Sequence, residues 1–180
     1  PIRRKSSNVR GATARNRSVT RVATKPVSTQ VHDESIRKTT YCNELWQECQ
    51  IAEGTPVESY LKNTRGLKIE TIPSALRYHP DLCASYPWAR RSRDNRFPAM
   101  VAAVVDEHNQ IKGLHITPIT KEGLRLTASK IMLGSIKGCS VRLFDVDPQK
   151  GELAIAEGIE TALGYAQLYG TPTWSALSAT

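Results

Sequence analysis

Hydrophobic residues recur at helical spacing from about residue 34 of this 180-residue chain. In the stretch ESIRKTTYCNELWQECQIAE they fall three or four residues apart, which predicts a helix with one buried face. These apolar positions are Cys42, Leu45, Trp46, Cys49 and Ala52. A second, shorter helix is predicted at residues 56–64. Thr55 can cap it, Glu58 stands three residues later as in a capping box, and Gly66 marks its end.

Between residues 74 and 146 the pattern changes to short apolar runs separated by turn residues. The piece SALRYHP is predicted to be extended, and DLCASYPWARRSRDNR is predicted to be a loop. The runs FPAMVAAVVD and IKGLHITPI flank the turn EHNQ, which predicts a β-hairpin. LRLTASKIMLG and SVRLFDV are predicted to be two further strands. We therefore expect this part of the chain to be mostly antiparallel β.

After Gly151 the pattern becomes strand, helix and strand, which predicts a parallel βαβ unit. A buried strand at residues 153–156 ends in Glu157, a helix follows from about residue 159 to 169, and a second apolar run covers 174–177. The fold class is therefore expected to be α+β. The predicted organisation is a basic disordered tail at 1–34, a helical and antiparallel β subdomain at 35–150, and the βαβ portion at 151–180.

The formal net charge of +8 is concentrated in residues 1–38, which hold ten Lys/Arg and two Asp/Glu; the rest of the chain holds fifteen of each. The beginning of the chain lacks apolar periodicity, so it cannot bury enough surface to offset the entropy of ordering. A solvated linker, a nucleic-acid-binding arm and a mitochondrial presequence remain open for it. No apolar run approaches the ~18 residues of a membrane span, and no two cysteines have C-x-x-C spacing. We expect reduced thiols and a cytoplasmic protein.

The acid at the strand end is the strongest candidate for chemistry. In a parallel βα unit, this position faces the crevice where ligands bind, next to the free N–H groups of the helix. Glu157 is therefore a candidate catalytic and Mg²⁺-binding residue, and Gly158 is expected to keep the turn tight. Glu160 has a simpler explanation, because an acid in a first helical turn favours the dipole.

Other polar groups are weaker candidates. Asp145 and Asp147 precede the strand, so they should lie at its other end and form a surface turn. The histidines have no ligand-like spacing and are expected to be structural or exposed. Four arginines of one predicted loop either are solvated or contact a phosphate backbone; they are Arg90, Arg91, Arg93 and Arg96.

The stretch GELAIAEGIETALGYAQLYGTPTWSAL resembles the opening of a Toprim domain, the metal-binding module of primases and topoisomerases. The motif EGIETAL is similar to the version found in primases of phages and mobile elements. Four upstream stretches resemble segments of these primases in the same order: TPVESYLKNTRGL, ALRYHP, FPAMVAAVVDEHNQIKGLHIT and SKIMLG. The resemblance covers about residues 35–179.

The resemblance implies a DNA primase that makes RNA primers from ribonucleotides on a single-stranded DNA template, with a replicative helicase as a possible partner. It implies that Glu157 is the first Toprim acid, which helps to hold Mg²⁺ for nucleotidyl transfer. It also implies that Lys130 faces template or nucleotide, and that 35–150 is the primase-core subdomain preceding a partial Toprim domain.

The chain departs from this family in three respects. The later D-x-D that completes the Toprim metal site does not follow Glu157. At the positions where an Arg and a Tyr are common in the family, this chain has Ile116 and Pro118. In addition, no zinc ribbon precedes the core. We therefore expect a truncated Toprim domain that binds Mg²⁺ weakly and is inactive alone. The alternative is a non-enzymatic nucleic-acid-binding protein derived from a primase, in which the basic tail carries the affinity.

Overall fold

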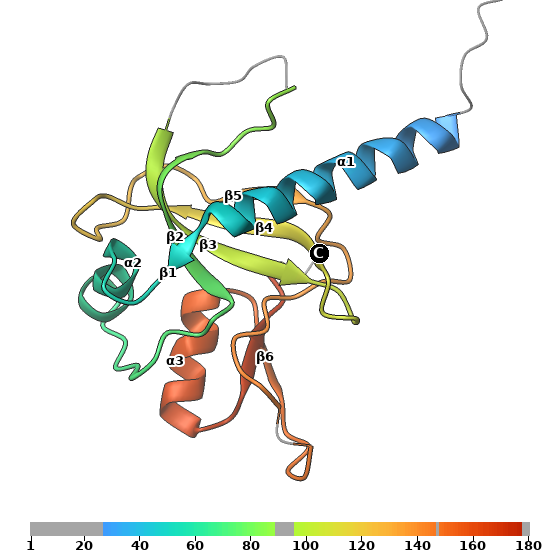
Figure 1. The fold of residues 1–180 in the computed structure, drawn as a ribbon. Helices are drawn as coiled ribbons and strands as arrows, with labels where there is room; N and C mark the ends of the chain where they lie inside the picture. Colours follow the sequence, from blue (N-terminus) through green and yellow to red (C-terminus); the bar gives the residue numbers. More distant parts are fainter. Residues whose placement is uncertain (1–26, 89–95, 147, 178–180) are drawn as a thin grey trace, which may run out of the picture.

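The computed structural model describes residues 27–88, 96–146 and 148–177, and its elements form a mixed α+β fold (Figure 1). The N-terminal half contains α1 (Val27–Glu48), β1 (Gln50–Ile51), α2 (Pro56–Ser59), the π-helical turn η1 (Tyr60–Thr64) and β2 (Leu76–Cys83). The remainder contains β3 (Arg96–Val105), β4 (Ile111–Pro118), β5 (Ile131–Gly134), β6 (Ala154–Ala156), α3 (Ile159–Tyr169) and β7 (Thr173–Ser175). The predicted fold class is confirmed.

The main sheet has the strand order β1-β2-β3-β4-β5, and each neighbouring pair is antiparallel. The predicted hairpin is formed by β3 and β4, with Val101 opposite Ile116 and Ala102 opposite His115. Because β3 lies in the centre of the sheet, residues on both of its faces are buried. This explains why its sequence is a continuous apolar run rather than an alternating one.

The two faces of the sheet have separate hydrophobic clusters. On one face, α1 lies across the strands (Figure 1), and its Cys42, Leu45 and Trp46 pack in one cluster with Val101. This confirms the predicted buried face of the first helix. On the other face, η1 and α3 pack against the residues of β3 that alternate with those of the first cluster. That second cluster contains residues of η1 and α3 together, so the βαβ portion shares a core with the rest of the fold.

The predicted βαβ unit is present. Strands β6 and β7 pair in parallel, with Ala156 opposite Ser175, and α3 connects them. The segment at residues 140–141 connects the small sheet to the large one through backbone hydrogen bonds. Ser140 exchanges backbone hydrogen bonds with Val105, and Val141 exchanges them with Ser175. This segment fixes the βαβ unit against the end of β3.

The helix boundaries differ from prediction in two details. Helix α1 begins at Val27, inside the segment predicted to be a disordered tail; residues 1–26 lie outside the described residues.

Thr55 caps α2 as predicted, accepting a hydrogen bond from the Val57 N–H. The capping box is not formed, however, because Glu58 accepts the Gly54 N–H instead of that of Thr55. Gly66 ends the segment in the left-handed conformation, with φ +70°.

Several strand predictions were wrong. The stretch 81–83, predicted to be loop, continues β2 past an irregularity between His79 and Leu82. Only residues 131–134 of LRLTASKIMLG form a strand, and SVRLFDV makes isolated bridges because it crosses between the two sheets. Strand β6 is not buried as predicted, since Ile155 is 60% exposed. Among the described helices, none has the length and apolar character that a membrane span requires.

Candidate functional site

The turn between β6 and α3 holds Glu157 in a fixed backbone position. The buried Ser175 side chain donates a hydrogen bond to the Glu157 carbonyl over 3.0 Å, and the Ala176 N–H donates to the Ala156 carbonyl over 2.8 Å. The Glu157 side chain is exposed and makes no hydrogen bond or ion pair with the residues that the structure describes. This arrangement presents an exposed carboxylate directly after the C-terminal end of β6.

The turn between β6 and α3 does not require glycine at position 158. The φ of −112° and ψ of 154° at Gly158 are extended backbone that any residue adopts. A Cβ built there would lie 3.7 Å from the Thr161 hydroxyl, an ordinary contact, so a tight turn does not require glycine. The missing side chain has a different consequence: position 158 supplies no capping acceptor, and in the first turn of α3 the Glu160 N–H is bound by the Glu160 carboxylate itself.

Lys130 reaches the first turn of α3 from the stretch that precedes β5. Its ammonium group lies 2.9 Å from Oε2 of Glu160 and 3.2 Å from Oε1. The Tyr60 hydroxyl, on η1, donates to the same Oε1 over 2.7 Å. Glu160 is thus more than a dipole-favouring acid, because it joins η1, the start of β5 and α3. The side chain of Glu160 is 9% exposed and that of Lys130 is 34% exposed.

The electrostatics of this network favour an ionised Glu160. Burial alone would raise the pKa of its carboxyl, but hydrogen bonds from Lys130, Tyr60 and its own backbone N–H outweigh burial and lower the pKa to about 2. Burial raises the pKa of Tyr60, and the hydrogen bond to Glu160 adds to that effect. At neutral pH the site therefore contains an anionic Glu160 and a neutral Tyr60.

Two buried polar side chains of β4 lie on the sheet face that carries η1 and α3. They are His115 and Thr117, which are 6% and 1% exposed. The Nδ1 atom of His115 and the hydroxyl of Thr117 have no hydrogen-bond partner among the described residues. Burial first, and then the charge of Lys130, lower the pKa of His115 to about 4. The imidazole is therefore neutral, which fits the structural role predicted for it.

The other predicted contacts are not brought together with Glu157. Arg96 binds Asp81, with Nε 2.7 Å from its carboxylate and Nη2 2.8 Å from its carbonyl. Arg90, Arg91 and Arg93 lie outside the described residues, as does Asp147. Ile116 is fully buried in the α1 cluster, so it offers no contact to a ligand.

The site offers Mg²⁺ one carboxylate. In the part of the chain that the structure describes, no three His, Cys, Asp or Glu side chains lie close enough together to hold a metal ion. Glu160 is already occupied by Lys130 and Tyr60. Mg²⁺ commonly binds through one or two carboxylates together with water and substrate phosphates. Glu157 fits that limited role, but the described residues do not fit a site with two metal ions.

The sequence analysis proposed two residues of this turn as functional and did not recognise the hydrogen-bond network around Glu160. It singled out Glu157 and Lys130, and the structure brings Lys130 to the residue three positions after Glu157. It did not find the partnership of Tyr60 with Glu160, because the two are a hundred positions apart. The one available signal was a tyrosine within the short helix predicted at 56–64, because a tyrosine needs a partner for its hydroxyl when it is buried.

Comparison with known proteins places the chain in one family. Searches of the curated proteins and of the solved structures gave no match. One family model, described as Domain of unknown function (DUF7146), matches residues 36–143. That match extends from α1 to the segment that crosses between the sheets, and it includes Lys130 but not Glu157. Because it covers more than half of the chain, the protein belongs to the DUF7146 family.

Proposed function

We propose that this chain is part of a primase-like protein that makes RNA primers on single-stranded DNA by Mg²⁺-dependent nucleotidyl transfer. The observation that carries the proposal is the contact between Lys130 and the first turn of α3. The stretch SKIMLG resembles the lysine-bearing segment that precedes Toprim in these primases, and EGIETAL resembles the opening of the Toprim domain itself. Their residues meet at 2.9 Å here although 30 positions separate them, which supports a common site.

The residues at this turn suit the handling of phosphate groups. Phosphoryl transfer depends mainly on positioning and on the neutralisation of charge. The Lys130 ammonium and the first-turn N–H groups of α3 other than that of Glu160 can attract a phosphate, and a helix of this length adds the positive end of its dipole. Glu157 would hold Mg²⁺, which when bound neutralises phosphate charge.

Lys130 can serve a phosphate without leaving the site. Its ammonium has three donors, and the pair with Glu160 uses only part of them. The Tyr60 hydroxyl also donates to the Glu160 carboxylate, which helps to fix the carboxylate that positions the lysine. Because the Lys130 side chain is one third exposed, an incoming phosphate can approach it from solvent.

The test is a paramagnetic binding experiment on the ¹⁵N-labelled chain, with Mn²⁺ in place of Mg²⁺ and with ATP present. We expect the amide signals of residues 157–161 to broaden first, and ATP to strengthen the effect because its phosphates supply further ligands. Glu157→Gln should abolish this local broadening. Lys130→Ala should reduce the part that depends on ATP.

Glu107→Gln serves as the matched control, because Glu107 is also an exposed acid but lies in the turn between β3 and β4. It should leave the broadening at residues 157–161 unchanged. Broadening centred on another acidic region, or unchanged in Glu157→Gln, would remove the basis for assigning the turn to metal and nucleotide.

One observation favours a second candidate, a non-enzymatic nucleic-acid-binding protein. Within residues 27–88, 96–146 and 148–177, no cluster of three potential ligands offers a complete metal site. Such a protein would bind single-stranded DNA in EDTA with no requirement for Mg²⁺, and ATP would not compete. A primase-like protein should bind ATP at the turn in a Mg²⁺-dependent way, so this comparison separates the two candidates.

A further inference from the structure

Three aromatic rings lie together where the chain leaves β2 and passes α1. The rings of Tyr86 and Trp88 are stacked, with centroids 5.0 Å apart and an interplanar angle of 23°. Tyr41, on α1, meets the Trp88 ring edge-on at 5.6 Å and lies 5.5 Å from Tyr86. All three side chains are partly exposed, so the group sits at the surface rather than inside the α1 cluster.

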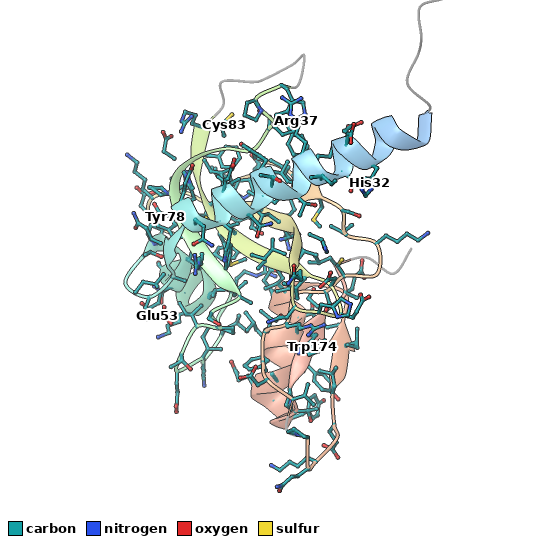
Figure 2. The ribbon with its side chains drawn as sticks, turned by 45° about the vertical axis from the view of Figure 1, so that its right-hand side comes forward. His32, Arg37, Glu53, Tyr78, Cys83 and Trp174 are labelled. Atoms are coloured by element: carbon teal, nitrogen blue, oxygen red, sulfur yellow. The ribbon has the colours of Figure 1, made fainter. Side chains whose placement is uncertain are left out.

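Two cations of α1 complete this aromatic group. The guanidinium carbon of Arg37 lies 3.9 Å from the centroid of the Trp88 ring, and the Lys38 ammonium lies 5.8 Å from that of Tyr86. Arg37 is exposed, and Figure 2 labels it on α1. Stacked rings with an exposed guanidinium are the chemistry on which bases stack in single-stranded nucleic-acid sites.

The rings are held in place by hydrogen bonds to backbone groups. The Tyr86 hydroxyl accepts from the Gly134 N–H over 2.6 Å, and the Tyr41 hydroxyl donates to the Ser85 carbonyl over 3.2 Å. Gly134 has φ +84°, and a Cβ there would collide with the Lys112 carbonyl, so glycine is required at this contact. A preformed group of rings does not need to be ordered when a ligand binds.

A small hollow of about 270 Å³ adjoins the rings, lined by Glu34, Ser35, Lys38, Gly134 and Ser135. Two hydroxyl groups and one ammonium there are donors that suit a phosphate. Lys38 is paired with Glu34 at 2.6 Å, but both side chains are substantially exposed. Exposed pairs of this kind are weak, so a phosphate can replace the carboxylate.

The sequence carries further positive charge before α1 and after Trp88. Residues 1–26, which precede α1, contain eight Lys/Arg and no Asp/Glu. Arg90, Arg91 and Arg93 closely follow Trp88 in the sequence. A polyanion is therefore the partner that the local charge favours, in preference to an apolar peptide or a second copy of this chain.

We propose that Arg37, Tyr41, Tyr86 and Trp88 form a stacking platform for the bases of a single-stranded nucleic acid, with a phosphate at Lys38. The inference rests on the proposed function for the class of its ligand, but it concerns a different surface from the turn at Glu157. A base stacks on the Arg37 guanidinium, or it displaces the guanidinium and stacks directly on the Trp88 indole. The platform would hold the strand while the turn at α3 handles the nucleotide.

The test is the binding of a fluorescein-labelled oligothymidylate to the whole chain, followed by fluorescence anisotropy. Stacking on one aromatic side chain corresponds to about 5-fold to about 100-fold in affinity, so Trp88→Ala should weaken binding within that range. Arg37→Ala should weaken it several-fold. Trp88→Phe should retain most of the affinity, because a phenyl ring still stacks, while removing the quenching of tryptophan fluorescence that the oligonucleotide causes.

Arg77→Ala is the matched control. It removes a guanidinium whose carbon lies 4.3 Å from the centroid of the Trp46 ring, so the charge lost is the same as in Arg37→Ala. Trp46 is buried. Arg77→Ala should leave oligothymidylate affinity nearly unchanged. Thermal unfolding of each variant verifies that it is folded.

The outcomes separate this inference from the proposed function. If folded Trp88→Ala and Arg37→Ala bind as tightly as the unchanged protein, the platform is refuted, while template binding elsewhere on the chain stands. If Trp88→Phe keeps full quenching, the indole does not contact the bases and the platform is likewise refuted. If no form of the protein binds single strands at low salt, both proposals fall.

Discussion

Replacing Glu160 by glutamine tests the network that positions Lys130. Glutamine can still accept the hydrogen bond of Tyr60, but it carries no charge for the Lys130 ammonium. The change therefore isolates the ionic part of the network. The folded state should lose the stabilisation that comes from keeping this carboxylate ionised.

The magnitude follows from the pKa of Glu160. A decrease from 4.5 to about 2 corresponds to about 3 kcal/mol of stability at about 1.4 kcal/mol for each pH unit. The carboxylate is 9% exposed but Lys130 is 34% exposed, so solvent screening reduces the expected loss to about 2 kcal/mol. Because the folded-state pKa is lowered, this stabilisation is fully present above pH 4.5 and disappears as the pH falls toward 2.

The assay is urea unfolding of the unchanged protein and of Glu160→Gln at a series of pH values from 7 downward. We expect a deficit of about 2 kcal/mol at neutral pH that narrows to about 1 kcal/mol or less near pH 3. Glu34→Gln, which breaks the exposed pair with Lys38, should change stability little at any pH. A deficit of the same size at every pH would refute the reasoning, because the loss would then be one of packing rather than of charge.

Three further predictions concern the tail, the exposed acid and the thiols. Deleting residues 1–26, which keeps α1 whole, should remove most of the slope of log affinity against log salt for single-stranded DNA. An unchanged slope would mean that the folded core, and not these residues, makes the phosphate contacts. Glu157→Ala should leave the thermal midpoint without metal unchanged, since its side chain is exposed, and a large decrease would mean that the residue is structural. Burial raises the pKa of Cys42 to about 11 and that of Cys49 to about 12. Iodoacetamide should therefore label the more accessible Cys83 and Cys139 before these two, and mass spectrometry that found early labelling of the two buried thiols would contradict this.

Local patterns were sufficient to predict many of the elements. The spacing of Cys42, Leu45 and Trp46 identified the buried face of α1, and Thr55 followed by proline located the start of α2. The run ending in Glu157 predicted the βαβ unit. These features depend on contacts between residues near each other in the sequence, which periodicity and capping preferences report directly.

The remaining features depend on contacts between distant parts of the chain. The segment at 140–146 has the composition of a strand, but its hydrogen bonds are divided between the two sheets, so it forms only isolated bridges. Strand β6 has the apolar character of a buried strand, yet nothing in the described residues covers Ile155. The meeting of Tyr60 with Glu160 depends on how η1 and α3 pack on one sheet face, which no local pattern specifies.

Primer synthesis by the polypeptide as its source cells make it tests the central claim most directly. The reaction would contain a single-stranded DNA template, labelled ribonucleotides and Mg²⁺, and its products would be separated by size. We predict short RNA products whose sequence follows the template and which disappear with Glu157→Ala. The absence of RNA products, or products that persist in Glu157→Ala, would contradict the account.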